Sequence, residues 1–256
     1  MIASLVLASA MTGGLLLGRM ALLLVVTAIG IAAGGELFRV ARARGARPMA
    51  ALGLVGIAGL FVVAHVRGDG APTVLPAAVS AVLAASFLLM MFRRDRRDAT
   101  KALVYTVFVV IVVGLPGSYV LALRASADGF RLVLGLVAMA VAADVVPVVL
   151  RAARGRGRHS AVHDPVWQRL VGALMGTISV AAVAAIAMAP PFTSARALVL
   201  AFLVAATATV AGPVFDMIET DLAPENGRGA IRLLPRIDAV LVSAPMFFYA
   251  FRVMAR

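Results

Sequence analysis

The chain is dominated by apolar stretches about as long as one membrane crossing. A helix needs about 20 mostly apolar residues to cross about 30 Å of hydrocarbon, at a rise of about 1.5 Å per residue. Nine stretches have this character, at about 2–18, 20–38, 49–66, 72–92, 102–123, 131–150, 170–189, 196–215 and 238–254. The sequence therefore predicts an all-α, polytopic integral membrane protein with about nine transmembrane helices.

The composition excludes most other classes of protein. Hydrophobic residues make up 62% of the 256 residues and charged residues 14%, whereas soluble domains average about 45–50% and about 25%. So few polar groups could not cover the surface of a soluble domain. The chain has no cysteine, which excludes disulfides and thiolate chemistry. Because the polar loops are too short to fold alone, we expect a single membrane-embedded helical domain over residues 1–256.

The basic residues predict how the chain lies in its membrane. Seventeen of the 24 Arg and Lys residues fall in even-numbered loops, at 39–48, 93–101, 151–169 and 216–237, and five fall in odd-numbered loops. Cytoplasmic loops carry the excess of basic residues, so we expect even-numbered loops in the cytoplasm and the N-terminus outside, in the inner (plasma) membrane. Because the basic residues lie between apolar runs, their expected partners are anionic lipid headgroups and not nucleic acid.

Asp144 is the only charged residue within the apolar run from Leu132 to Leu150. A carboxylate at bilayer depth costs a few kcal/mol or more unless it is paired, protonated or hydrated. One interpretation is a metal ligand or substrate contact in a water-filled cavity. The other is an Asp near the cytoplasmic end of a helix, paired with Arg151.

Two further carboxylates lie where apolar runs end or begin. Asp216 ends the eighth run, and Glu219 follows on the same helix face, so the pair could bind a divalent cation or form a solvated helix end. Asp238 opens the last run, where an Asp caps free N–H groups. Arg236 could bind phosphate there or neutralise Asp238.

The loop between the sixth and seventh runs is basic. The strip from Arg154 to His159 could neutralise a phosphate or anchor the chain at the cytoplasmic surface. His163 and Asp164 are the residue types of a general-base pair. The glycine pairs at 30 and 34 and at 172 and 176 have the spacing that allows two membrane helices to pack closely.

Several of these segments, taken in order from about residue 20 to the end, resemble the phosphatidate cytidylyltransferases, also called CDP-diacylglycerol synthases. The matching segments are Gly35-Glu36-Leu37-Phe38-Arg39, Leu115-Pro116-Gly117-Ser118, Ala143-Asp144, the basic loop 151–158, Trp167, the residues Gly212, Phe215 and Asp216, Arg236-Ile237-Asp238, and Ser243-Ala244-Pro245.

The resemblance implies transfer of a cytidylyl group from CTP to phosphatidate, which yields CDP-diacylglycerol and pyrophosphate. It implies that residues 1–130 form the N-terminal helices and that residues 131–256 form the part that carries the site. The implied catalytic residues are Asp144, Asp216 and Asp238, with Mg²⁺ at Asp216 and Asp238. The implied substrate-binding residues are Arg236, Arg151, Arg156 and Trp167. The implied partners are membrane lipids, phosphatidate and CTP, and a homodimer is possible.

The chain departs from the family pattern at several positions. His163-Asp164-Pro165-Val166 replaces a lysine-rich stretch, Pro213 and Pro235 each replace an Asp, and Arg228 to Arg232 occupies the place of a Pro-Gly-His-Gly-Gly turn. A proline cannot ligate a metal, so we expect weak, altered or absent catalysis. The alternatives are therefore a transferase, an inactive relative that acts as a lipid-binding or partner subunit, and an ion-coupled transporter that uses Asp144.

Overall fold

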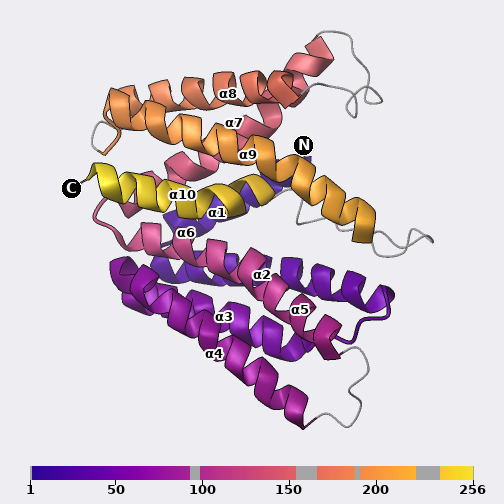
Figure 1. Cartoon of the computed structure of the whole chain (residues 1–256). Helices are drawn as coiled ribbons and strands as arrows, with labels where there is room; N and C mark the ends of the chain where they lie inside the picture. The colour runs from indigo at the N-terminus through magenta and orange to yellow at the C-terminus, as the bar shows by residue number, and fades with distance from the viewer. Residues whose placement is uncertain (1, 93–98, 154–165, 188–190, 223–236, 256) are drawn as a thin grey trace. The chain divides into compact units, whose positions relative to one another are not determined.

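The computed structural model describes residues 2–92, 99–153, 166–187, 191–222 and 237–255 (Figure 1). Within these ranges, it describes the backbone alone at 2–8, 151–152, 166–169, 186–187, 213 and 215–222. The described chain consists of helices joined by turns. They are α1 (Ile2–Leu16), α2 (Arg19–Ala43), α3 (Ala50–Arg67), the 3₁₀ turn η1 (Gly68–Gly70), α4 (Ala71–Met91), α5 (Ala99–Val109), the π-helical turn η2 (Val110–Gly114), α6 (Leu115–Ala125), α7 (Gly129–Ala153), α8 (Val166–Ala187), α9 (Ser194–Leu222) and α10 (Asp238–Met254).

The predicted all-α class is confirmed, and each of the nine apolar runs coincides with helix. In the part of the chain that the structure describes, five helical segments are long and apolar enough to cross a membrane. These are Arg19–Ala43, Ala50–Met91, Ala99–Ala125, Gly129–Leu150 and Ser194–Gly212, and Leu170–Ala185 is a shorter apolar helix. The count of nine crossings is not confirmed.

The difference between nine runs and five segments has two physical reasons. The segment Ala50–Met91 has 42 residues and contains two predicted runs, which form α3 and α4. These two helices pack against each other and are joined through η1. Gly68 in η1 has a φ of 55°, a left-handed conformation that suits glycine. The helices α1 and α10 have 15 and 17 residues, and the apolar helix Leu170–Ala185 of α8 falls in the same range of length, so all three are shorter than the usual crossing length.

The expected orientation needs one correction. Nine crossings place the two chain ends on opposite sides of a membrane, and cytoplasmic even-numbered loops then place the N-terminus in the cytoplasm. An N-terminus outside is therefore incompatible with nine crossings and cytoplasmic even-numbered loops. The cytoplasmic position of the even-numbered loops stays a prediction.

The chain divides into two compact units. One comprises residues 1–12, 127–214 and 236–256, and the other comprises 13–126 and 215–235. The expected single domain, with its division at residue 130, stays a prediction. The first unit contains α7, α8, α10 and most of α9, and the second contains α2 to α6.

Glycines allow α2 and α3 to pack closely in the second unit. A methyl group at Gly30 would lie 2.5 Å from the Phe61 ring, and one at Gly34 would lie 2.8 Å from Ile57. Both distances are well below ordinary carbon contact. The prediction that these glycines serve helix packing is confirmed.

Glycines also allow α7 and α8 to pack closely in the first unit. A methyl group at Gly172 would lie 3.2 Å from Pro147, and one at Gly176 would lie 2.7 Å from Val146. The predicted packing role of this glycine pair is also confirmed. The two glycines hold α8 against the stretch of α7 that carries Asp144.

Candidate functional site

Asp144 lies on α7 among small and branched apolar residues. Ala143, which precedes it, is buried in a cluster with Ala173 of α8 and Ala205 of α9. Asp144 itself is half-buried. It lies six residues before Leu150, where the apolar segment of α7 ends, which is a distance of about 9 Å along the helix. A carboxylate at this depth needs a polar or charged partner.

Asp238 is the first residue of α10 and is buried, with 6% of its surface exposed. Its Oδ1 atom accepts a hydrogen bond of 2.7 Å from the backbone N–H of Ala239. A carboxylate in the first turn of a helix also faces the positive end of the helix dipole. The predicted position of Asp238 at the start of the last helix is confirmed. The N-cap residue itself is Ile237, and among the described residues no side chain caps it.

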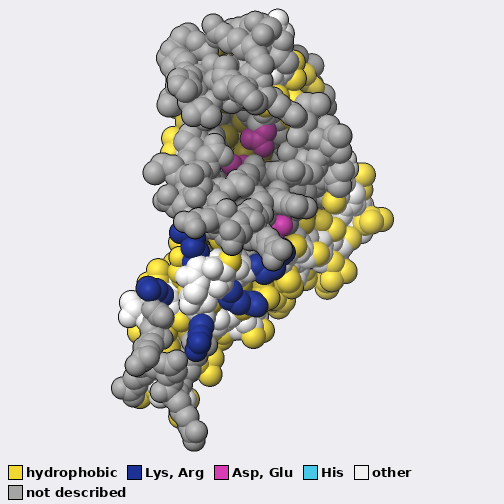
Figure 2. Space-filling model, turned by 90° about the vertical axis from the view of Figure 1, so that its right-hand side faces the viewer, with side chains coloured by type: hydrophobic (Ala, Val, Ile, Leu, Met, Phe, Trp, Pro, Cys, Tyr) yellow, Lys and Arg dark blue, Asp and Glu magenta, His cyan; other side chains and the backbone are white. Residues whose placement is uncertain are grey.

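The structure places Asp144 and Asp238 within electrostatic range of each other. Helix α10 packs against α7 within one compact unit, and the two carboxylates are close enough to interact electrostatically. Figure 2 shows acidic side chains on the face that it presents. Two neighbouring carboxylates repel each other unless a proton or a cation lies between them. A proton or a cation between these two carboxylates would relieve this repulsion.

The other predicted site residues lie outside the part of the chain whose side chains the structure describes. Arg156 and Arg236 lie outside the described residues altogether. For Arg151, Trp167 and Asp216, the structure describes the backbone alone, in α7, α8 and α9. The same limits apply to the basic strip 154–159, to His163 with Asp164, and to Glu219.

The carboxylate pair suits one kind of metal site. Among the described residues, no group of three or more His, Asp or Glu side chains could hold a metal ion. Magnesium, however, is commonly held by one or two carboxylates together with waters and the phosphates of a substrate. Two carboxylates are a donor set of this kind, and within the described residues Asp144 and Asp238 belong to no cage made of protein ligands alone.

One further feature of α10 is not predicted by the sequence. The buried hydroxyl group of Ser243, just over one turn after Asp238, donates a hydrogen bond to the carbonyl oxygen of Ala239, so it is already used by the helix. The resemblance implies Asp144 and Asp238, together with Asp216, as catalytic residues, but the sequence alone does not show that two of them lie within electrostatic range. The one available signal was that both residues lie at ends of apolar runs on the same predicted side of the membrane.

Comparison with known proteins assigns the chain to a family. A family model described as the cytidylyltransferase family matches residues 1–222. Neither a search of curated proteins nor a search of solved structures found a match. The matched range includes Asp144 and ends before Arg236 and Asp238. Because it covers most of the chain, and because the chain is a helical protein with apolar segments of membrane-crossing length, the protein belongs to the cytidylyltransferase family, that of the phosphatidate cytidylyltransferases.

Proposed function

We propose that this protein transfers a cytidylyl group from CTP to the phosphate of phosphatidate, and so forms CDP-diacylglycerol and pyrophosphate. Membership of the family supports nucleotidyl transfer as the general chemistry. The observation that carries the proposal is that two carboxylates, Asp144 and Asp238, lie within electrostatic range of each other on helices that pack together.

The reaction requires the cancellation of negative charge. An oxygen of the lipid phosphate attacks the α-phosphorus of CTP, and the bond between this phosphorus and the pyrophosphate oxygen breaks. Both reactants are polyanions, so Asp144 and Asp238 alone would repel them. Magnesium, when bound, neutralises phosphate charge and stabilises the leaving pyrophosphate. Asp144 and Asp238 would hold it, with Asp216 as the further ligand that the family pattern implies.

The remaining residues of the proposed site bind and orient the substrates. Arg151, Arg156 and Arg236 carry the charge and the geometry to hold phosphate groups, and Trp167 offers an aromatic face. The start of α10 beside Asp238 adds the positive end of a helix dipole. These groups would align the lipid phosphate with CTP, and alignment contributes several kcal/mol to a reaction of two molecules.

The location of the carboxylates supports a lipid substrate. The phosphate of phosphatidate lies at the membrane surface, and Asp144 lies about 9 Å inside the end of its apolar segment. The proposed orientation places this end of α7 and the start of α10 at the cytoplasmic face of the plasma membrane, where CTP is available.

The second candidate is an inactive relative that binds lipid or a partner subunit. It is favoured by the two prolines, Pro213 and Pro235, that stand in place of family carboxylates, and by the pair of carboxylates, instead of three, among the described side chains. No observation in the described structure favours ion-coupled transport through Asp144.

Labelled CTP, phosphatidate and Mg²⁺ in proteoliposomes that contain the full chain separate the two candidates. We expect labelled CDP-diacylglycerol, and we expect Asp144→Asn and Asp238→Asn each to lower turnover on the order of 10²–10³-fold, as for loss of other electrostatic elements. The matched control is Asp128→Asn. Asp128 immediately precedes the first residue of α7, and the substitution removes only a solvent-exposed ion pair with Arg131, whose N and O atoms lie 3.9 Å apart. The absence of product with Mg²⁺ or other divalent metals, together with retained binding of phosphatidate, would favour the inactive relative.

A further inference from the structure

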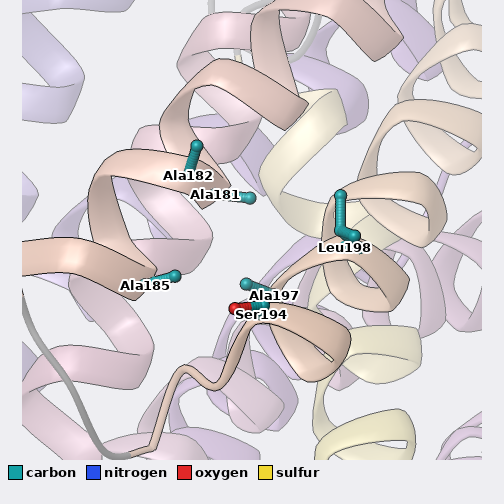
Figure 3. Close-up of a pocket in the computed structure, with 6 residues that line it drawn as sticks. All are labelled: Ala181, Ala182, Ala185, Ser194, Ala197 and Leu198. Carbon is teal, nitrogen blue, oxygen red and sulfur yellow. The ribbon is translucent and has the colours of Figure 1, made fainter.

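An apolar cavity of about 240 Å³ lies between α8 and α9. Figure 3 shows its lining residues facing one another across the gap between the two helices. They are Ala181, Ala182 and Ala185 on α8, and Ser194, Ala197 and Leu198 on α9. The alanine methyl groups are too short to fill the space, and the Ser194 hydroxyl is the one polar side-chain group among these six residues.

The cavity suits a hydrocarbon occupant. Ala181 and Ala197 are buried and form its floor, whereas Ala182 and Leu198 are exposed at its edge. Both helices are apolar over this stretch, and the α9 segment is long enough to cross a membrane, so the open side faces lipid. An apolar cavity of about 150 Å³ stays dry and binds benzene. A larger one is therefore sufficient for the end of an acyl chain.

The same two helices link the cavity to the carboxylate pair. Ala173 of α8 and Ala205 of α9 pack with Ala143, the residue before Asp144. Of the buried lining residues, Ala181 lies eight positions after Ala173 and Ala197 lies eight positions before Ala205, which is about 12 Å at 1.5 Å per residue. The acyl chains of one leaflet cover about 15 Å, half of the hydrocarbon thickness. A lipid whose phosphate lies beside Asp144 can therefore place the end of an acyl chain in the cavity.

We propose that the cavity between α8 and α9 binds the distal part of an acyl chain of the phosphorylated lipid substrate, and so selects long chains over short ones. This inference rests on the proposed function. A chain that ends before the cavity leaves it unfilled, and each buried methylene group contributes about fourfold in affinity. The alanines set the selection, because larger side chains at the same positions would occupy the space.

A phosphatidate with a photoreactive diazirine at the end of one acyl chain tests this directly. The full chain is placed in lipid nanodiscs with this probe, irradiated, digested and sequenced by mass spectrometry. We expect crosslinks in 181–185 and 194–198 that excess dioleoyl phosphatidate removes and excess dioleoyl glycerol, which lacks the phosphate, does not. Crosslinks spread over all lipid-exposed helices, or equal competition by both lipids, would overturn the proposal, because either result indicates bulk lipid.

Filled-cavity variants provide the second arm. Ala182→Leu with Ala185→Leu should lower the crosslink yield in the cavity about tenfold and shift the turnover preference about tenfold from dioleoyl towards dioctanoyl phosphatidate, as expected from the exclusion of roughly two methylene groups. The control Val183→Leu lies on the same turn, is exposed and does not line the cavity, so it should change neither quantity.

The two arms separate failure of this inference from failure of the proposed function. Crosslinking needs no turnover, so phosphate-dependent crosslinks in the cavity without product would refute the transferase and leave the cavity proposal intact. Turnover with a chain-length preference that the filled variant does not change would refute the cavity proposal alone.

Discussion

Gly176 should be required both for stability and for the position of Asp144. A methyl group at Gly176 would lie 2.7 Å from Val146 Cγ2 and 2.8 Å from the carbonyl oxygen of Ala142. Ordinary carbon contacts lie at about 3.5–4.0 Å, so α8 must move away from α7 by about 1 Å. The carbonyl oxygen belongs to the backbone and cannot rotate away. Gly176→Ala therefore strains the stretch of α7 on both sides of Asp144.

The magnitude follows from two opposing effects. Overpacking costs about 1–3 kcal/mol, and the rigid contacts at Gly176 place it at the upper end of that range. Replacing glycine by alanine in a helix returns up to about 1 kcal/mol. We expect Gly176→Ala to lower the free energy of unfolding by about 2 kcal/mol, a fall of roughly 4–8 °C in melting temperature.

Thermal unfolding of the full chain in detergent measures this change. Gly59→Ala is the matched control, because Gly59 lies inside α3 and a methyl group there would meet nothing within 4 Å. This control should raise the stability by up to about 1 kcal/mol. We therefore expect Gly176→Ala to lower the stability and Gly59→Ala to raise it. A gain in stability from Gly176→Ala would refute the close packing of α7 on α8.

The second readout for the same variant is turnover. A shift of about 1 Å at a site can cost on the order of 10² in rate, so Gly176→Ala should lower the transfer of cytidylyl groups even below its melting temperature. Gly59→Ala should leave the rate unchanged. Unchanged turnover in Gly176→Ala would show that the α7–α8 contact does not position Asp144.

Three further predictions concern the buried polar groups and the metal. Asp238→Ala should lose about 1 kcal/mol of stability, because it removes the acceptor for the Ala239 N–H. Asp238→Asn keeps an acceptor and should lose turnover with little change in melting temperature. Equal melting temperatures of the two variants would contradict the role of this hydrogen bond. Thr106→Val should lower the free energy of unfolding by about 1–3 kcal/mol, because the Thr106 hydroxyl accepts a 3.0 Å hydrogen bond from the Met49 N–H, which would then lack its partner. Ser118→Ala should cost less, because the Ser118 hydroxyl donates to the Gly114 carbonyl oxygen within the same helical segment. The reverse order of the two losses in thermal unfolding would refute this reasoning. Chelation of divalent cations should abolish transfer from labelled CTP and added Mg²⁺ should restore it, whereas full turnover in excess chelator would exclude a magnesium-dependent site.

The sequence was sufficient to predict the helices and insufficient to predict how they pack. Apolar runs of crossing length, interrupted by arginine-rich loops, predict each helix because the spacing of the apolar residues is local information. The separation of the runs 2–18 and 20–38 follows from the same local information, and in the structure α1 and α2 are separated next to Gly18, which has a φ of 112°. The continuity from Ala50 to Met91 depends on a single 3₁₀ turn at Gly68–Gly70, which composition does not reveal.

The candidate site was predicted in part. The depth of Asp144 and the helix-start position of Asp238 follow from the sequence pattern. Their neighbourhood does not, because it depends on the packing of α10 against α7, which are far apart in the chain. The glycine spacing at 172 and 176 predicted a close helix pair without naming the partner helix. The cavity between α8 and α9 left no pattern in the sequence, because alanines serve equally well in tight contacts and in gaps.

The central claim is that Asp144 and Asp238 act as one unit in cytidylyl transfer. It is tested most directly by the rates of transfer from labelled CTP to phosphatidate in Asp144→Asn, Asp238→Asn and the double variant, compared with the unmodified chain. Residues that act as a unit give strongly non-additive losses, so the double variant should be no slower than the slower single variant. Losses that multiply, or a double variant as fast as the unmodified chain, would contradict the account.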